Sequence, residues 1–390
     1  MAAVEAAEAP VRARPAWVDA LITQGVALVT AFLFAAIVGG FIIAAFGESP
    51  LVIYSTVWQF GTARTQDFAR VLQIATPLIF SALAVAVAFR AGMFNIGVEG
   101  QYIVGMMTAS AAAVTLDGIL PGYTLLLAVI LAGVLGSMLW AFVPAILKVK
   151  TGAHEVVTTI MMNGIALSLV AWALLNPLKS PEGGLIDLRT DRFVENARVP
   201  TIGESLGIEE TIPPSVHLSW LFVLALVACL LVWFLLYRTR LGYEIRAVGS
   251  SAGSAEAGGV SIGATQLKVF LISGALAGFV GLNHLLVEQG FFGSTYQQFL
   301  GFEGIAVAFL GRNSPVGIPL AAILLGMLRR GQDGIAVTTD LPEEILVILE
   351  GVLILSVVIA YGIATRILAR RRQQVERITE ERVAKAEEAA

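Results

Sequence analysis

The sequence predicts an all-α, polytopic membrane protein with about ten transmembrane helices, and three observations support this fold class. Hydrophobic side chains make up 57% of the 390 residues and charged ones only 14%, and the mean hydropathy is +0.82. Apolar runs of about 20 residues recur along the chain, which is the length a helix needs to cross a bilayer core. Runs such as 221–236 lack the alternating pattern of a barrel strand, so helices are the expected way to satisfy the backbone in lipid.

Apolar runs between charged or Pro- and Gly-rich boundaries define the expected helices. They cover residues 18–46, 68–90, 96–116, 122–147, 154–175, 217–237, 266–288, 303–311, 315–329 and 342–367. A membrane domain therefore occupies residues 18–367, between a short N-terminal segment, 1–17, and a charged tail, 368–390. The segments 303–311 and 315–329 are short, so one of them is a candidate re-entrant segment.

Lysine and arginine in the short loops predict the orientation of the chain. If every span alternates, these loops fall on one side, which is predicted to be the cytoplasm. Both termini are then cytoplasmic, and the chain lies in the cytoplasmic membrane. The loop residues are Arg12, Arg14, Arg90, Lys148, Lys150, Arg238, Arg240, Arg246, Arg366, Arg370, Arg371 and Arg372. Arg329 and Arg330 fall on the outer side and do not fit this scheme.

Composition and missing motifs exclude several classes of function. A net charge of −4, with basic residues in short clusters, argues against a nucleic-acid partner. A single cysteine, Cys229, allows no intramolecular disulfide, and the three histidines show no metal-ligand spacing. The chain has no phosphate-binding loop and no Gly-Lys pair, so ATP would have to be hydrolysed by a separate subunit. We therefore expect a transport protein with no metal or cofactor of its own, since the convergent acid, base or metal groups of a membrane-embedded enzyme are missing.

Two hydrophilic excursions interrupt the apolar pattern. The outer loop, 176–215, mixes Pro, Gly and acidic residues and suits a surface that a soluble partner touches. The inner loop, 238–263, has a centre of small residues that can form a short helix, and Gly258 and Gly259 provide its C-terminal stop. A short helix lying on the membrane surface is expected to dock a partner.

The segment 89–102 carries the first candidate solute site. Three glycines, each weakening a helix by about 1 kcal/mol, lie among polar side chains that are costly in a membrane. Transporters use such interrupted helices to bind solutes. The candidates here are Phe94, Asn95, Glu99 and Gln101, with Asn163 from a later span.

A similar interruption lies in the other half of the chain, at residues 301–317. Both segments place a glycine directly after a carboxylate, Glu99 in the first and Glu303 in the second. Interruptions at matching places in two related halves predict a midplane site, so Glu303 joins the candidates. Each carboxylate has an alternative interpretation, as a group at an aqueous boundary or in a structural hydrogen bond. His284 beside Asn283 favours a hydrogen bond between helices over a metal ligand.

These motifs resemble the permease subunits of ATP-binding-cassette importers, in the branch that handles simple sugars, branched-chain amino acids and nucleosides. The resemblance covers about residues 68–365. The sequence FRAGMFNIGVEGQ at 89–101 is similar to the nucleoside members, where sugar members typically have an Ile-Asp-Leu-Ser-Val-Gly type of sequence. Residues 241–262, followed by ISGALAG at 272–278, resemble the coupling region, and GIAVAFLGRN at 304–313 also fits.

The resemblance implies several partners and one solute class. It implies a cytoplasmic ABC ATPase, a second permease that is identical or a paralogue, and an external solute-binding lipoprotein or periplasmic receptor. Residues implied to face the ATPase are Glu244, Arg246, Ser250, Ser254, Glu256, Gly258 and Gly259. A nucleoside is neutral and rich in hydrogen-bonding groups, which suits amides and aromatic rings. A permease for simple sugars or another small polar solute, and an ion-coupled secondary transporter, remain the alternatives.

Overall fold

The computed structural model describes residues 33–34, 36–182 and 188–338, with isolated positions from 348 to 366. The chain divides into two compact units, residues 53–343 and residues 1–52 with 344–390, and each is considered by itself. In the second unit the described part includes the helix Ala36–Ala45, which falls within the expected span 18–46. Residues 18–32 and 35 of that span, most of 342–367 and the tail 368–390 lie outside the described residues.

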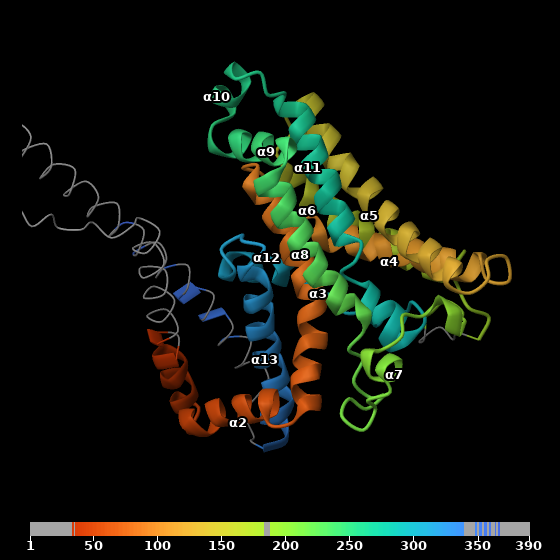
Figure 1. The fold of residues 1–390 in the computed structure, drawn as a ribbon, viewed down its shortest axis with the longest axis vertical. Helices are drawn as coiled ribbons and strands as arrows, with labels where there is room; N and C mark the ends of the chain where they lie inside the picture. The colour runs from red at the N-terminus through yellow and green to blue at the C-terminus, as the bar shows by residue number, and fades with distance from the viewer. Residues whose placement is uncertain are drawn as a thin grey trace, which may run out of the picture. The chain divides into compact units, whose positions relative to one another are not determined.

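The described part of the chain is helical and has no strand beyond two isolated β-bridges. The helices run in the following order (Figure 1): α2 Pro50–Thr62, α3 Thr65–Arg90, α4 Val98–Thr115, α5 Tyr123–Thr151, α6 Glu155–Leu175, α7 Ile202–Leu206, α8 Trp220–Arg238, α9 Arg240–Ser250, α10 Ala252–Ala257, α11 Ile262–Ala277, the π-helix η2 His284–Gln289, α12 Leu300–Leu310 and α13 Gly317–Thr338. The predicted all-α membrane fold is confirmed.

Burial separates one central helix from the helices around it. Among the described residues, four helices are long and apolar enough to cross a membrane. In α3, 83% of the most apolar stretch is buried, against 22% in α5, 22% in α6 and 33% in α8. Helix α3 contacts α8, α11, α12 and α13, and Figure 1 shows it running between α13 and α8. A helix that is apolar all round and buried is a core element, whereas exposed apolar faces on α5, α6 and α8 suit lipid.

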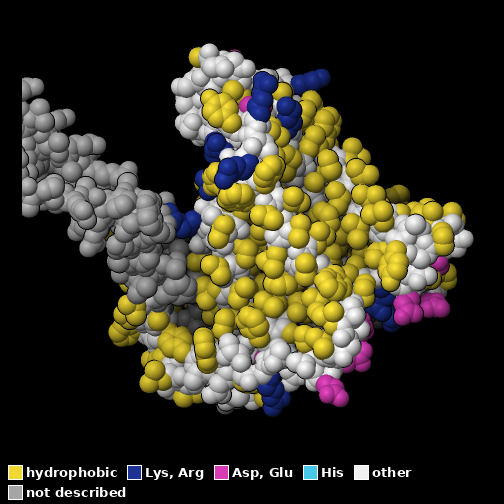
Figure 2. Space-filling view, viewed as in Figure 1, with side chains coloured by type: hydrophobic (Ala, Val, Ile, Leu, Met, Phe, Trp, Pro, Cys, Tyr) yellow, Lys and Arg dark blue, Asp and Glu magenta, His cyan; other side chains and the backbone are white. Residues whose placement is uncertain are grey.

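The surface of residues 53–343 is divided by chemistry along its length. Figure 2 shows hydrophobic side chains covering the face formed by α5, α8 and α11. Lysine and arginine gather at the end that carries α9 and α10, and acidic side chains lie mainly toward the other end (Figure 2). An apolar band bounded by charge is the pattern expected of a protein that spans a bilayer.

Several predicted bounds are corrected by the structure. The span 266–288 is not one helix, because α11 ends at Ala277 and the π-helix η2 follows it. Helix α13 continues to Thr338, nine residues beyond the predicted end at 329. Helices α2 and α9 were not predicted, whereas α10 lies where a short helix was expected. The total of about ten spans remains a prediction, since four qualify by length and composition among the described residues.

Candidate functional site

The two predicted interruptions lie at residues 91–97, between α3 and α4, and at residues 311–316, between α12 and α13. Their position was predicted, but the role of the glycines is partly corrected. Gly92 has φ +70 and forms the turn after α3, as only glycine does easily. Gly100 and Gly304 lie inside regular helices, where they permit close packing instead of breaking the helix.

Aromatic side chains bring the two interruptions together. The ring of Phe309 in α12 lies 5.3 Å from that of Phe89 and 6.1 Å from that of Phe94, measured between centroids. Phe89 and Phe94 themselves contact edge to face at 5.9 Å. Edge-to-face and stacked pairs at these distances are favourable. Phe94, a predicted solute contact, is half-buried, and Phe89 is 40% exposed, so this cluster retains accessible aromatic surface.

The amides of Asn95 and Gln101 form a closed network. The Asn95 Nδ2 donates to Gln101 Oε1 at 3.0 Å and to Ser273 Oγ at 2.8 Å. Gln101 Nε2 donates back to Asn95 Oδ1 at 3.1 Å. The same Asn95 oxygen also accepts from the backbone N–H of Gly97. The Gln101 and Asn95 side chains are both 1% exposed. Buried amides satisfied this completely hold segment 91–97 against α4 and α11.

Asn163 in α6 completes the anchoring of this segment. Its Oδ1 accepts from the backbone N–H of Gly100 at 2.9 Å, and its Nδ2 donates to the carbonyl of Ile96 at 3.0 Å. A side chain that bonds backbone groups on both sides of a helix start fixes the position of α4 relative to α6.

Glu99 accepts hydrogen bonds from the start of α12. Its Oε1 accepts from the N–H of Phe299 at 2.7 Å, and its Oε2 accepts from the N–H of Gly301 at 2.8 Å. The Tyr102 hydroxyl lies 3.0 Å from Glu99 Oε1 and 2.9 Å from the carbonyl of Gln297. A carboxylate at a helix N-terminus satisfies orphan backbone donors and interacts favourably with the helix dipole. Glu99 therefore makes a structural hydrogen bond between helices, which was one of the alternative interpretations of this carboxylate.

Glu303 has a different partner. It forms an ion pair with Arg329 of α13, and both side chains are partly exposed, at 16% and 21%. The neighbouring Arg330 pairs with Asp67 of α3 at 3.1 Å and with Asp333 at 2.6 Å. These ion pairs explain why Arg329 and Arg330 are tolerated on the side of the membrane where the positive-inside rule does not expect arginine. Membrane-embedded charges are paired in this way because an unpaired charge is expensive.

The predicted coupling residues lie on α9 and α10 and the turn that follows. Tyr243, Arg246, Ser250, Ser254 and Gly258 line a hollow of about 380 Å³ between these helices. The guanidinium of Arg246 stacks over the Tyr237 ring at 5.5 Å. Ser250, Ser254, Glu256, Gly258 and Gly259 are exposed, and Glu244 pairs with Arg240 at 3.2 Å. Helices α9 and α10 lie at the end of the molecule that is rich in basic side chains, where a partner can reach them (Figure 2).

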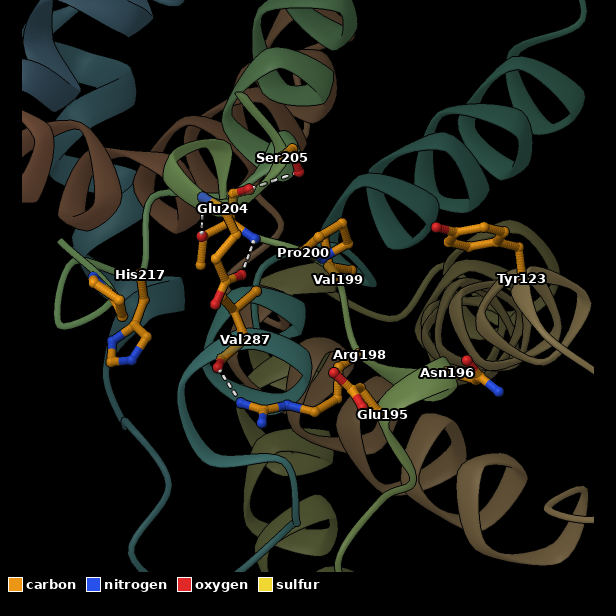
Figure 3. Close-up of a pocket in the computed structure, with 12 residues that line it drawn as sticks. Tyr123, Glu195, Asn196, Arg198, Val199, Pro200, Glu204, Ser205, His217 and Val287 are labelled. Carbon is orange, nitrogen blue, oxygen red and sulfur yellow. Dashed lines mark hydrogen bonds between the residues drawn. The ribbon is translucent and has the colours of Figure 1, made fainter. Parts of the chain in front are cut away.

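A second hollow, of about 820 Å³, lies between the outer loop, the start of α5 and η2 (Figure 3). Arg198 crosses its floor and donates to the carbonyl of Val287 at 2.6 Å. Thr201 and Glu204 form a capping box at the start of α7, on the wall of the hollow. Figure 3 shows Glu195, Asn196 and Tyr123 around the same opening. This part of the outer loop therefore forms a shaped, polar surface.

The hydrogen bond of His284 lies within its own π-helix, η2, and not between helices as predicted. His284 Nδ1 lies 3.0 Å from Glu288 Oε2, and Glu288 Oε1 accepts from Asn283 Nδ2 at 3.0 Å and Gln73 Nε2 at 2.9 Å. No group of three or more potential metal ligands occurs among residues that the structure describes. Gln73 and Ser273 were not predicted as partners in these networks, because nothing local to either residue indicates a partner so far along the chain.

The fold is that of a membrane transport protein: its helices have exposed apolar faces, two of its segments are interrupted, and the loop with α9 and α10 is accessible. Comparison with known families identifies its class. The family described as "Branched-chain amino acid transport system / permease component" matches residues 68–358. The chain belongs to this permease family.

Three relatives cover most of the chain. The guanosine ABC transporter permease protein NupP of Bacillus subtilis (strain 168) is 36% identical over 334 residues, 83% of this chain and 90% of the relative. The glucose ABC transporter permease protein TsgB13 of Haloferax volcanii is 30% identical over 346 residues, 89% of each chain. The nucleoside ABC transporter permease protein NupB of Lactococcus lactis subsp. cremoris (strain MG1363) is 30% identical over 336 residues, 85% of this chain and 90% of the relative.

Proposed function

We propose that this chain is the permease subunit of an ATP-driven importer that carries nucleosides across the cytoplasmic membrane. The observation that carries the proposal is the 36% identity to a guanosine permease over 83% of this chain. The motif at residues 89–101 supports the same solute class. ATP hydrolysis belongs to a separate subunit, and this chain changes shape.

The working complex contains a second permease, identical or paralogous, together with cytoplasmic ATPases and an external solute-binding lipoprotein. The ATPases grip α9 and α10, and their closure rocks the membrane helices between outward- and inward-facing states. The basic end that carries α9 and α10 then faces the cytoplasm (Figure 2), in keeping with the positive-inside rule. We propose from the loop charges of the sequence that both termini are cytoplasmic as well. The external receptor meets the polar outer hollow of Figure 3.

Six side chains are proposed to form the solute site: Phe94, Asn95, Glu99, Gln101, Asn163 and Glu303. Phe94 and Glu303 are partly exposed and suit direct contact with the base and the ribose hydroxyls. The other four are buried and hold the wall of the site, so their effect on transport comes through its shape. No acidic or basic cluster is needed, because the solute is neutral.

Uptake of radiolabelled guanosine by cells that express the complete transporter tests this assignment. Asn95→Ala removes the hydrogen bonds to Gln101 and Ser273 and should reduce initial uptake by about tenfold at equal membrane expression. Gln59→Ala is the matched control, because Gln59 is an exposed amide on α2. Wild-type rates in both Asn95→Ala and Glu99→Ala would contradict the site. Uptake that survives ATP depletion but stops with an uncoupler would instead favour an ion-coupled transporter.

A simple sugar is the second candidate solute, because the glucose permease relative covers 89% of this chain at 30% identity. Unlabelled glucose and unlabelled guanosine in excess over the labelled solute distinguish the two. Competition by guanosine alone supports the proposal, and competition by glucose alone replaces it with a sugar permease.

A further inference from the structure

Helix α9 rests directly on the backbone at the end of α3. Gly249, near the end of α9, packs closely against the backbone of Arg90 and Ala91. A Cβ atom at Gly249 would overlap the carbonyl oxygen of Arg90 and would lie 3.0 Å from the carbonyl carbon of Arg90 and 3.1 Å from that of Ala91. The reciprocal contact is also close, since a Cβ on Gly92 would lie 3.4 Å from the Gly249 Cα. Interfaces of backbone against backbone leave no flexible side chain to absorb a displacement.

The side chain of Arg90 continues this contact to the second interruption. Its Nε and Nη2 both donate to the carbonyl oxygen of Asn313, at 3.1 and 3.0 Å. Arginine can form this two-pronged bond because its guanidinium is planar and presents neighbouring donors in a fixed geometry. One residue therefore contacts α9 through its backbone and the α12–α13 turn through its side chain.

The turn that receives these bonds is tightly packed and has an unusual backbone conformation. Arg312 and Asn313 both have positive φ, 60 and 49, which non-glycine residues adopt at a cost that the surrounding structure must offset. The N–H of Asn313 bonds the carbonyl of Ala308 at 2.6 Å, and Gly311 packs against the backbone of Gly317 and Ile318. A pull on the Asn313 carbonyl is therefore transmitted to α12 and α13.

We infer that Arg90 is a positioning residue that couples movement of α9 to both interrupted segments. Displacement of α9 by a partner moves the end of α3 through Gly249, the segment 91–97 through the chain itself, and the 311–316 turn through the guanidinium. The inference rests on the proposed function in one respect, that the force on α9 comes from an ATPase.

The first test measures the ratio of solute transported to ATP hydrolysed, with the complete transporter in proteoliposomes. Arg90→Lys keeps the charge but cannot form the two-pronged bond, so solute uptake should fall about tenfold while ATPase activity stays within about twofold of wild type. A residue with a merely structural role would lower both activities together. An unchanged ratio would overturn the inference.

A second pair of variants tests the backbone contact without touching Arg90. Gly249→Ala forces α9 away from Arg90 and should lower the same ratio, whereas Gly253→Ala in α10 has nothing within 4 Å of the added methyl group and should leave it unchanged. If the two variants transported equal amounts of solute per ATP hydrolysed, the contact between Gly249 and Arg90 would not couple α9 to the interrupted segments. These variants also keep the inference testable if Arg90→Lys fails to assemble.

The final test does not depend on the solute. Spin labels at Arg240→Cys and Val316→Cys, in a Cys229→Ser background, report the distance between α9 and the α12–α13 turn; Arg240 and Val316 are both exposed. We expect a narrow distribution of this distance in the protein with Arg90 and a broader one in the Arg90→Lys variant, both measured without nucleotide. A distribution that is equally narrow in both proteins would sink the inference, even if the transported solute proves not to be a nucleoside.

Discussion

Glu99 and Glu303 occupy equivalent places in sequence, each followed by glycine, but their partners are of different kinds. Glu99 accepts bonds from the backbone N–H groups of Phe299 and Gly301 and is 5% exposed. Glu303 pairs with the long side chain of Arg329, and its own side chain is 16% exposed. Backbone N–H partners move only with the start of α12 itself, whereas an arginine side chain can turn to another acceptor. The first carboxylate is thus suited to holding the helices together, and the second to a site that changes partners.

The glycines that follow the two carboxylates should show the largest difference. A Cβ on Gly304 would overlap Ser81 and lie 2.8 Å from its carbonyl carbon, so Gly304→Ala should destabilise the folded permease by about 3 kcal/mol or more. Gly100→Ala should cost less, because the overlap is smaller: the atom nearest to the added Cβ, Asn163 Oδ1, would lie 2.8 Å away. Thermal unfolding in nanodiscs measures both.

Gly164→Ala is the control for this pair, because nothing lies within 4 Å of a Cβ there. It should change stability by less than about 1 kcal/mol, or raise it slightly through helix propensity. Equal melting temperatures for the Ala variants of Gly304 and Gly164 would show that α12 does not pack on α3 as described.

Replacing each carboxylate by its amide should have the next largest effect. Glu99→Gln keeps the shape but places an NH₂ group against one backbone donor, so it should cost about 2 kcal/mol, while Glu303→Gln should cost less, because the long side chain of Arg329 can turn to another acceptor. Melting temperatures of the two variants under the same conditions provide the measurement. A larger loss for Glu303→Gln would reverse the assignment of the rigid and the exchangeable carboxylate.

A charge exchange between Glu303 and Arg329 should have the smallest net effect. Each single variant, Glu303→Arg or Arg329→Glu, juxtaposes like charges, and the double variant restores the pair, recovering about 1 kcal/mol of the stability lost. A double-mutant cycle on the free energy of unfolding gives the coupling. A coupling of zero would mean that the ion pair contributes nothing to the folded state.

The long apolar helices were predictable from sequence because their signal is local. The expected span 154–175 differs from Glu155–Leu175 by a single residue, and 68–90 differs from α3 only at its start. Helix α2 was missed because its 13 residues include Tyr54, Trp58 and Gln59, which weaken the apolar signal. Helix α9 was missed because it lies among charged residues at one end of the molecule, where hydropathy does not report helix formation.

Which polar side chains lie inside the membrane helices was predictable from sequence, but their contacts were not, and their role in a solute site stays a prediction. Polar groups in apolar runs identified Asn95, Glu99 and Asn163, since such groups are costly wherever they lie. Their partners depend on tertiary structure: Ser273 lies 178 positions from Asn95, and Gly301 lies 202 positions from Glu99. The role of Gly304 was misjudged for the same reason, because a glycine that weakens a helix and one that packs against a distant Ser81 have the same local sequence.

The shortness of α12 has one more consequence. Eleven residues at a rise of about 1.5 Å span about 16 Å, roughly half the hydrocarbon core, so one end of this helix stops where lipid headgroups cannot hydrate it. The oxygens of Glu99 take the place of water at that end. In the proposed transport path, this end of α12 would therefore offer a solute no free N–H groups at Phe299 and Gly301, because Glu99 already accepts from both.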